Sequence, residues 1–405
     1  MKIVIIISFV FIFCYCKNSR YHENSNTLRL SDTELIKMET NHSLQIIDTR
    51  KAIKKNTNEI VDMIDEVYYI PLDSEELIGE ISKMVVTKDK IFILDSHVAQ
   101  KIIVFDKEGH FLFQIKDQGQ GPTEYVSLWD MQIDTLKNEV IVNDALMRSY
   151  IYYSTEDGKF IRKIKGISNC YFAKQDNKYI NLLNYGQDFN EEEDWSIIIT
   201  DKDSIIKKGF EQYPMQRGDY IMNSLFSDVE GSLLYTPIYS DTIYQLIIES
   251  SSYPKYVILQ NKSIWKLKNQ ALSPNDISRL IKEEDYTCFS GVLYHSNDYA
   301  IFNILHSFRE YVANKSYIWN EKMNELYEWH KESDLLAFEK DEKIVRKLKH
   351  IIPSPTTVYK NMFYGIITPF PLDNKYEYLD KNLKSILKNL DDDSNPILVI
   401  YSFKS

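Results

Sequence analysis

The chain has 405 residues, and its 48 lysines and arginines against 59 aspartates and glutamates give a formal net charge of −11. This acidity argues against a basic nucleic-acid-binding domain, while the 44% apolar content is ample for a core. Glycine is scarce at 12 residues and tyrosine abundant at 29, which excludes collagen-like and low-complexity disordered chains.

The N-terminus predicts an export signal. A short positive start precedes an unbroken apolar run over residues 3–13. The run is too short for a spanning helix of about 20 residues and is typical of a secretory signal peptide. Cys14 and Cys16 follow, before a polar stretch, so the segment resembles a bacterial lipoprotein signal, in which a cysteine is acylated. An ordinary cleaved signal and an uncleaved N-terminal anchor are the alternatives.

We expect cleavage before Cys16 and lipid attachment at this residue. Residues 1–15 are then the signal peptide, and residues 16–60 read as a tether, within which residues 32–38 could start a short helix. Cys170 and Cys288 are then the remaining thiols. They form neither a disulfide framework nor a zinc or redox motif, so we expect two separate buried thiols.

From Val67 onward, short runs of β-branched and aromatic residues recur between turn residues. Residues 90–115 align without a gap onto residues 139–164, at an offset of 49 positions, which places Asp95 on Asp144 and Ile102 on Ile151. Each unit reads as strand, polar loop, strand, glycine turn, strand. One further strand upstream makes each unit a four-stranded antiparallel propeller blade.

The repeat length predicts one all-β domain over residues 61–405, a six-bladed β-propeller, with a more crowded seven-bladed ring as the alternative. Weaker copies occupy residues 167–209 and 220–260, and the fifth blade takes strands between residues 286 and 320, after a helix expected at 273–285 with Ser273 as its N-cap. The further expected features are a helix-prone insertion at 320–350, a helix near 374–389, and ring closure by pairing of residues 66–72 with residues 396–403.

Several segments carry a family resemblance. VYYIPLD, IFILDS, IIVFDKEGHF, the loop QGQGPTEY and the ending NPILVIYSF resemble the six-bladed β-propeller lipoproteins of Bacteroides and relatives, a branch related to NHL-repeat propellers. In this family the loop usually reads GPGEY, and Thr123 replaces its second glycine. The resemblance implies the fold and a location in the cell envelope, at the outer membrane, and it implies no reaction.

The motifs that usually carry chemistry are absent from the sequence. QGQGPTEY has no Gly-Lys-Ser/Thr and joins strands, so we interpret it as a structural connection between blades. No nucleophile elbow, zincin or EF-hand pattern occurs, and the acidic run at 391–393 reads as a solvated surface. We therefore expect no catalytic residue, no metal and no cofactor.

Topology favours one face of the propeller for binding. In an antiparallel blade, the loop between strands 2 and 3 and the connection into the next blade emerge at the same end. This loop face carries the longer and more varied loops, which is where binding residues usually lie. The ligand-binding candidates on it are His97, Gln120, Glu124, Arg148, Tyr185, Asp188, Tyr239 and Asp241.

These patterns favour a non-catalytic binding or scaffolding module, monomeric and lipid-tethered, that recognises a glycan, a peptide or an envelope protein. The alternative is an enzyme, namely a hydrolase or lyase acting on a sugar or lactone at the central channel, with metal dependence open. A purely structural subunit of an envelope complex is the third hypothesis.

Overall fold

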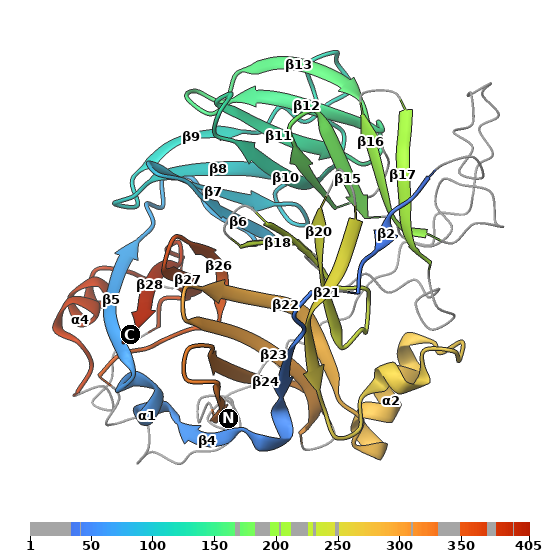
Figure 1. Ribbon diagram of the computed structural model, residues 1–405. Helices are drawn as coiled ribbons and strands as arrows, with labels where there is room; N and C mark the ends of the chain where they lie inside the picture. Colours follow the sequence, from blue (N-terminus) through green and yellow to red (C-terminus); the bar gives the residue numbers. More distant parts are fainter. Residues whose placement is uncertain are drawn as a thin grey trace.

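The computed structural model shows six small β-sheets arranged in a ring (Figure 1). It describes residues 34–40, 42–166, 171–182, 195–201, 204–211, 226–229, 232–247, 251–308, 311–330, 349–370, 378–391 and 393–405. The chain is thus a six-bladed β-propeller, which confirms the predicted fold class.

Each blade has four antiparallel strands, numbered outward from the ring's centre. Blade 1 consists of β6 (Lys83–Val86), β7 (Lys90–Asp95), β8 (Lys101–Asp106) and β9 (Phe111–Ile115). Blade 2 consists of β10 (Leu128–Asp134), β11 (Glu139–Asp144), β12 (Ser149–Ser154) and β13 (Phe160–Lys165). Blade 3 consists of β14 (Phe172–Gln175), β15 (Lys178–Leu182), β16 (Trp195–Asp201) and β17 (Ser204–Glu211).

The other three blades repeat this plan. Blade 4 consists of β18 (Phe226–Val229), β19 (Ser232–Tyr235), β20 (Thr242–Ile247) and β21 (Ser251–Leu259). Blade 5 consists of β22 (Cys288–Ser296), β23 (Tyr299–Phe308), β24 (Tyr311–Asn320) and β25 (Glu325–His330). Blade 6 consists of β26 (Pro355–Tyr359), β27 (Met362–Ile367), β28 (Ile397–Phe403) and β5 (Ile64–Pro71).

The last blade closes the ring with strands from both ends of the chain, as predicted. β5 pairs antiparallel with β28, with Tyr69 opposite Val399 and Val67 opposite Tyr401. Closure of this kind leaves neither strand as an unpaired end of the ring.

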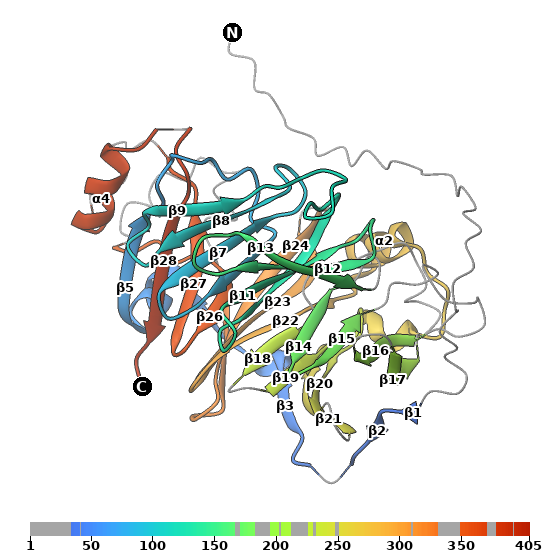
Figure 2. The same cartoon turned by 90° about the horizontal axis from the view of Figure 1, so that it is seen from above.

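An N-terminal strap, residues 34–56, runs along the outside of blades 3 to 5, and Figure 2 shows its first strands at the periphery. Its strands are β1 (Glu34–Leu35), β2 (Lys37–Met38), β3 (Gln45–Asp48) and β4 (Ile53–Asn56). β1 pairs with β17, β2 and β3 pair with β21, and β4 pairs with β25, all in parallel. The short helix expected over residues 32–38 is therefore wrong where the structure describes it, because residues 34–38 hydrogen-bond to blade edges instead.

Two further expectations need correction. The ungapped repeat places Ile102 on Ile151, but Ile102 pairs with Leu94 whereas Tyr150 pairs with the equivalent Asn143. The loop before β12 is one residue shorter than the loop before β8. The turn after β12 is one residue longer than the turn after β8, so the offset of 49 positions holds again in β13. The predicted insertion at 320–350 begins too early, since Glu325–His330 is the fourth strand of blade 5.

The helices are few and lie outside the blades. α1 (Thr57–Val61) follows the strap, and α2 (Pro274–Glu284) has the predicted Ser273 cap, whose hydroxyl accepts from Asp276 N. α4 (Lys381–Lys388) lies within the predicted 374–389 region, and the short 3-10 helices η1 (Thr49–Lys51) and η3 (Ile264–Leu267) complete the set of described helices. No described helix is long and apolar enough to cross a membrane.

Candidate ligand site at the loop face

Asp95, the last residue of β7, is fully buried and organises the loops around it. Its Oδ2 accepts from the backbone N–H groups of Gly79 and Glu80, each at 2.9 Å. Its Oδ1 accepts from Val98 N at 3.0 Å and Ala99 N at 2.9 Å. One carboxylate thus ties the chain that enters the blade to the loop between its second and third strands.

Asp144 repeats this arrangement in blade 2. It is also fully buried, and its carboxylate accepts from Val126 N, Ser127 N and Met147 N. The strand 2 to 3 loops and the incoming connections therefore lie at one end of both blades. Because their hydrogen bonds come from backbone N–H groups of the loops, these two carboxylates hold the loop face together. Asp144 Oδ2 also lies 3.8 Å from Lys163 Nζ.

A cavity of about 270 Å³ opens at this end of the inner strands. Its walls come from blades 1, 2, 3, 5 and 6, so it lies where the blades converge on the ring's centre. The residues that carry its polar and aromatic chemistry are Ser82, Lys83, Ser96, His97, Trp129, Asp130, Tyr171 and Tyr294.

An ion pair crosses the cavity wall between the first two blades. Lys83 Nζ, at the start of β6, donates to Asp130 Oδ1 at 2.7 Å, and Asp130 is 1% exposed. Asp130 Oδ2 accepts from Phe172 N of blade 3 at 3.0 Å. Lys83 keeps a quarter of its side chain exposed, so its ammonium is the more accessible partner in the cavity.

Aromatic side chains supply the apolar part of the wall. The rings of Trp129 and Tyr171 lie 6.1 Å apart between centroids and are tilted by 53°. Burial raises the pKa of Tyr294 to about 12, and burial together with the charge of Asp130 raises the pKa of Tyr171. Both phenols are therefore neutral at physiological pH and can donate hydrogen bonds.

His97 is the sequence-predicted candidate that lines the cavity. Its Nδ1 lies 2.8 Å from Ser96 Oγ and 3.2 Å from Ser82 Oγ, with 53% of its side chain exposed. Glu80 Oε2 lies 3.9 Å away. The imidazole is thus held by two hydroxyls at the rim and keeps an open edge.

Other predicted candidates lie in loops away from these cavity walls. Gln120 and Arg148 are exposed. Glu124 Oε2 accepts from Gly121 N at 2.7 Å, and a Cβ at Gly119 would clash with the same carboxylate. Glu124 therefore shapes its own loop, which agrees with the structural interpretation of QGQGPTEY.

Two candidates lie in the loop between β19 and β20 of blade 4, and one of them is buried. Tyr239 is 5% exposed and belongs to a hydrophobic cluster with Ile264 and Cys288. Asp241 Oδ1 accepts from Gln260 Nε2 at 2.5 Å, and burial raises its pKa to about 6. Tyr185, Asp188, Cys16 and Cys170 lie outside the described residues, and a ligand-binding role for the eight candidates stays a prediction.

Sequence reasoning missed Lys83, Trp129 and Asp130. Each stands at the start of an inner strand, in ISKMVV or SLWDMQI, where a charge next to apolar strand residues was a usable signal.

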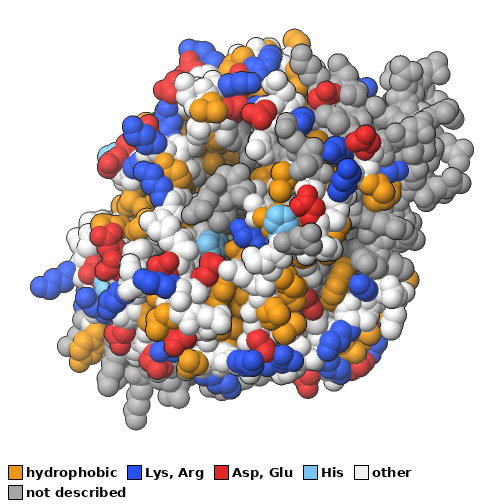
Figure 3. All heavy atoms as spheres, viewed as in Figure 1, with side chains coloured by type: hydrophobic (Ala, Val, Ile, Leu, Met, Phe, Trp, Pro, Cys, Tyr) orange, Lys and Arg blue, Asp and Glu red, His pale blue; other side chains and the backbone are white. Residues whose placement is uncertain are grey.

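Among the residues that the structure describes, no three His, Cys, Asp or Glu side chains gather closely enough to hold a metal ion. In Figure 3, charged, histidine and apolar side chains are interspersed on the face in view.

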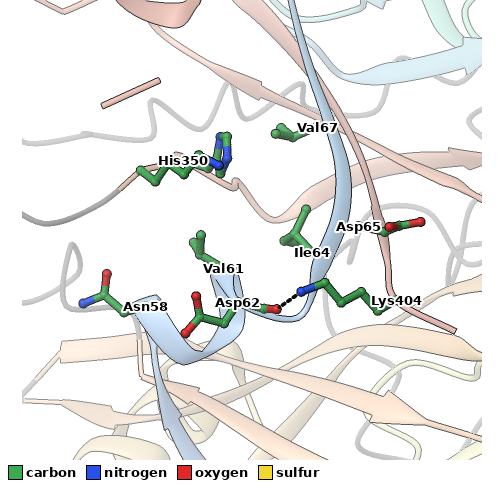
Figure 4. Close-up of a pocket in the computed structure, with 9 residues that line it drawn as sticks. Asn58, Val61, Asp62, Ile64, Asp65, Val67, His350 and Lys404 are labelled. Atoms are coloured by element: carbon green, nitrogen blue, oxygen red, sulfur yellow. Dashed lines mark hydrogen bonds between the residues drawn. The ribbon is translucent and has the colours of Figure 1, made fainter. Parts of the chain in front are cut away.

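A second cavity, of about 260 Å³, lies where α1 and the start of β5 meet His350 and Lys404 (Figure 4). Lys404 Nζ donates to Asp62 O at 2.6 Å across its floor. Tyr69 Oη lies 3.4 Å from His350 Nδ1 and accepts from Ile351 N at 3.1 Å. The first contact fastens the C-terminus to the end of α1, and the other two tie β5 to the segment before β26, so this cavity reads as a structural joint.

Comparison with known proteins identifies the family. The model of the domain of unknown function DUF4934 matches residues 44–402, and the chain belongs to this family. No curated protein matches the chain.

Two solved structures share the fold. One is a Bacteroides fragilis protein described as a "putative exported protein", at 16% identity and TM-score 0.70, with 90% of this chain and 100% of that chain covered. The other is a DUF4221 member from Bacteroides vulgatus, at 12% identity and TM-score 0.51, with 84% and 97% covered. At these identities the likeness shows the propeller alone.

Proposed function

We propose that this protein is an exported, non-catalytic binding propeller that holds one sugar unit of a glycan in the central cavity of its loop face. The observation that carries the proposal is the wall itself, where Trp129 and Tyr171 adjoin the Lys83 ammonium within one cavity. Ligand sites typically combine aromatic walls with a few convergent polar groups.

The cavity's size and chemistry favour a sugar over the other ligands considered. At about 270 Å³ it is below the usual range for drug-sized ligands, so it suits a single ring or chain end. An aromatic face packs against the C–H face of a sugar ring, while Lys83, His97 and the tyrosine hydroxyls supply donors and acceptors for its hydroxyl groups. An apolar peptide side chain would leave these groups without partners.

The N-terminus and one solved relative support the proposed location. The apolar run at 3–13 and Cys16 support export and lipid attachment at the outer membrane, and the "putative exported protein" of B. fragilis has the same fold over 90% of this chain. A lipid tether would hold the loop face near envelope or host glycans. Acylation is tested by the mass of the mature N-terminal peptide, which should carry acyl chains on Cys16.

Binding is tested on a printed glycan array, followed by calorimetry with the free sugar of each glycan that binds. We expect Trp129→Ala to weaken binding about tenfold or more, because it removes the ring, and Trp129→Phe to retain most affinity. Trp129 Nε1 has no hydrogen-bond partner among the described residues, so Trp129→Phe sacrifices no such bond.

Three outcomes would count against the proposal. If wild type and Trp129→Ala bind the glycan with equal affinity, the binding site does not lie in this cavity. Turnover of a bound glycan or lactone would replace the binding module with the enzyme hypothesis. A peptide ligand that competes at the same cavity would keep the site and change the ligand class.

A further inference from the structure

The outer strands of this propeller accept extended chain segments. β17, β21 and β25 are the fourth strands of blades 3, 4 and 5, and each is covered by a parallel strand of the strap. The fit is chemical as well as geometric, since the register places Glu34 beside Lys207 and Lys54 beside Glu328. The fold therefore contains three blades in which an extended segment adds a strand to the outer edge.

Three outer strands have no covering strand among the described residues, namely β5, β9 and β13. Charged side chains on an edge strand usually protect it from pairing with other chains. β5 carries Asp65 and Glu66, and β13 carries Arg162, Lys163 and Lys165. β9 has the sequence FLFQI and carries no charge, although Lys116 follows it where Lys165 ends β13, so it has the fewest charges of the three edges.

The backbone register shows which groups this edge presents. In blade 2, Gly166 N donates to Arg148 O at 2.7 Å. Bonded pairs alternate along an antiparallel ladder, so Ile164 also bonds inward toward Tyr150, and the N–H and C=O of Lys165 point outward. β13 defines the pattern for its repeat partner in blade 1.

Blade 1 has the same ladder, with Ile115 opposite Ile102 where blade 2 has Ile164 opposite Tyr150. Its outward backbone groups therefore belong to Gln114 and Lys116, although the C=O of Lys116 already accepts from Gln118 N at 2.7 Å. Phe111 N, at the start of the strand, donates to Asp73 Oδ2 at 3.1 Å, so the edge offers its bonding groups mainly at Gln114. Leu112 lies on the same strand and is 42% exposed. An apolar side chain beside outward-facing backbone groups is the combination that a peptide strand uses for affinity and selectivity.

We propose that β9 is a docking edge for an extended, uncharged segment of another protein, which adds a fifth strand parallel to it and packs an apolar side chain on Leu112. The strap provides the precedent for both the position and the direction. In chemical terms the partner is a β-branched or aromatic stretch without charge.

A second copy of this chain is the weaker occupant. Antiparallel pairing of two β9 strands would join five residues from each copy, and a strand pair of that length buries a few hundred Å² at most, below the roughly 1,200 Å² of stable interfaces. An extended segment needs less area because its main chain supplies most of the hydrogen bonds.

The probe is a fluorescent peptide of about ten residues, alternating threonine and valine between terminal lysines, added to the full mature protein. We expect saturable binding by fluorescence anisotropy, with protection of the Gln114 and Lys116 amides from hydrogen exchange. The same peptide N-methylated at alternate residues should bind about tenfold more weakly or not at all, because it lacks half of its donors.

Matched variants locate the site. Leu112→Lys should weaken binding about tenfold, because an edge lysine opposes strand addition. Ile161→Lys, at the equivalent position of blade 2 and 43% exposed, should leave it unchanged. Gln114→Pro should abolish binding by removing an outward N–H. Circular dichroism checks that each variant is folded. If Gln114→Pro does not fold, the test of the docking edge rests on Leu112→Lys.

Four results would overturn the proposal. The two lysine variants could weaken binding equally, or the methylated peptide could bind as well as the parent. Probe binding that appears only after removal of residues 17–33 would show that the chain's own N-terminal segment occupies the edge. A dimer by light scattering that Leu112→Lys dissociates would assign the edge to a second copy.

Discussion

Lys83 Nζ and Asp130 Oδ1 lie 2.7 Å apart and join blade 1 to blade 2 at the wall of the central cavity. Because Asp130 also accepts from Phe172 N, its carboxylate connects three consecutive blades. The same pair therefore serves the stability of the ring and the polarity of the candidate site.

Removing the Lys83 ammonium should lower the stability of the folded protein. Lys83→Met leaves the buried Asp130 carboxylate without its cation, and we expect the free energy of unfolding to fall by about 3 kcal/mol in urea denaturation. The double variant Lys83→Met with Asp130→Asn should recover part of this loss, since the buried charge is gone. Lys159→Met, in the exposed Lys159–Asp157 pair, serves as the control and should leave stability unchanged. Strictly additive single and double effects would contradict the coupling.

The loop QGQGPTEY makes a separate prediction. Gly119→Ala should lower the free energy of unfolding by about 1 kcal/mol, because the new Cβ pushes the flexible Glu124 carboxylate away from Gly121 N. Glu124→Ala added to Gly119→Ala should remove the clash, so a thermal double-mutant cycle should show a favourable interaction term. If Gly119→Ala is neutral alone, the loop does not depend on this contact.

The repeat made the ring predictable. Glycine turns fix where each hairpin reverses, and Gly109 and Gly158 have φ values of 93° and 69°, as side-chain-free positions allow. Buried aspartates recur because each must bind the same loop amides, as Asp95 and Asp144 do. Repetition of a physical requirement is visible in sequence as repetition of residues.

The strap was not predictable by the same means. Glu34 and Leu35 form a two-residue strand with both side chains exposed, so no alternation of burial marks it. It is held by backbone pairing to an edge far away in sequence, which leaves no local pattern. The cavity was missed for a related reason, since which of six inner strands contribute Lys83 or Trp129 depends on how the blades converge.

The strap's attachment can be tested with two neighbouring isoleucines in β3. Ile47 is 1% exposed and packs in a core cluster with Tyr256, whereas Ile46 is 56% exposed. Ile47→Ala should lower the free energy of unfolding by about 3 kcal/mol, and Ile46→Ala should change it by less than about 0.5 kcal/mol. Equal effects in chemical denaturation would show that β3 does not lie on blade 4 in this register.

Asp241 gives stability an unusual dependence on pH. Burial raises its pKa from 3.8 to about 6 in the folded chain, although hydrogen bonds from Ser263 and Gln260 oppose the shift. A carboxyl group with a raised folded pKa favours the folded state while it is protonated. Its contribution is therefore complete below about pH 4 and is lost as the pH rises through about 6.

Asp241→Asn should consequently stabilise the protein at neutral pH. The amide cannot ionise, so we expect a gain of about 2 kcal/mol near pH 7.5 and little change near pH 4, where the aspartate is already protonated. Urea denaturation at the two pH values measures the difference within one variant and provides its own control. A gain of equal size at both pH values would assign the effect to altered packing, and a loss near pH 7.5 would mean that the ionised carboxylate is a net stabilising partner of Gln260.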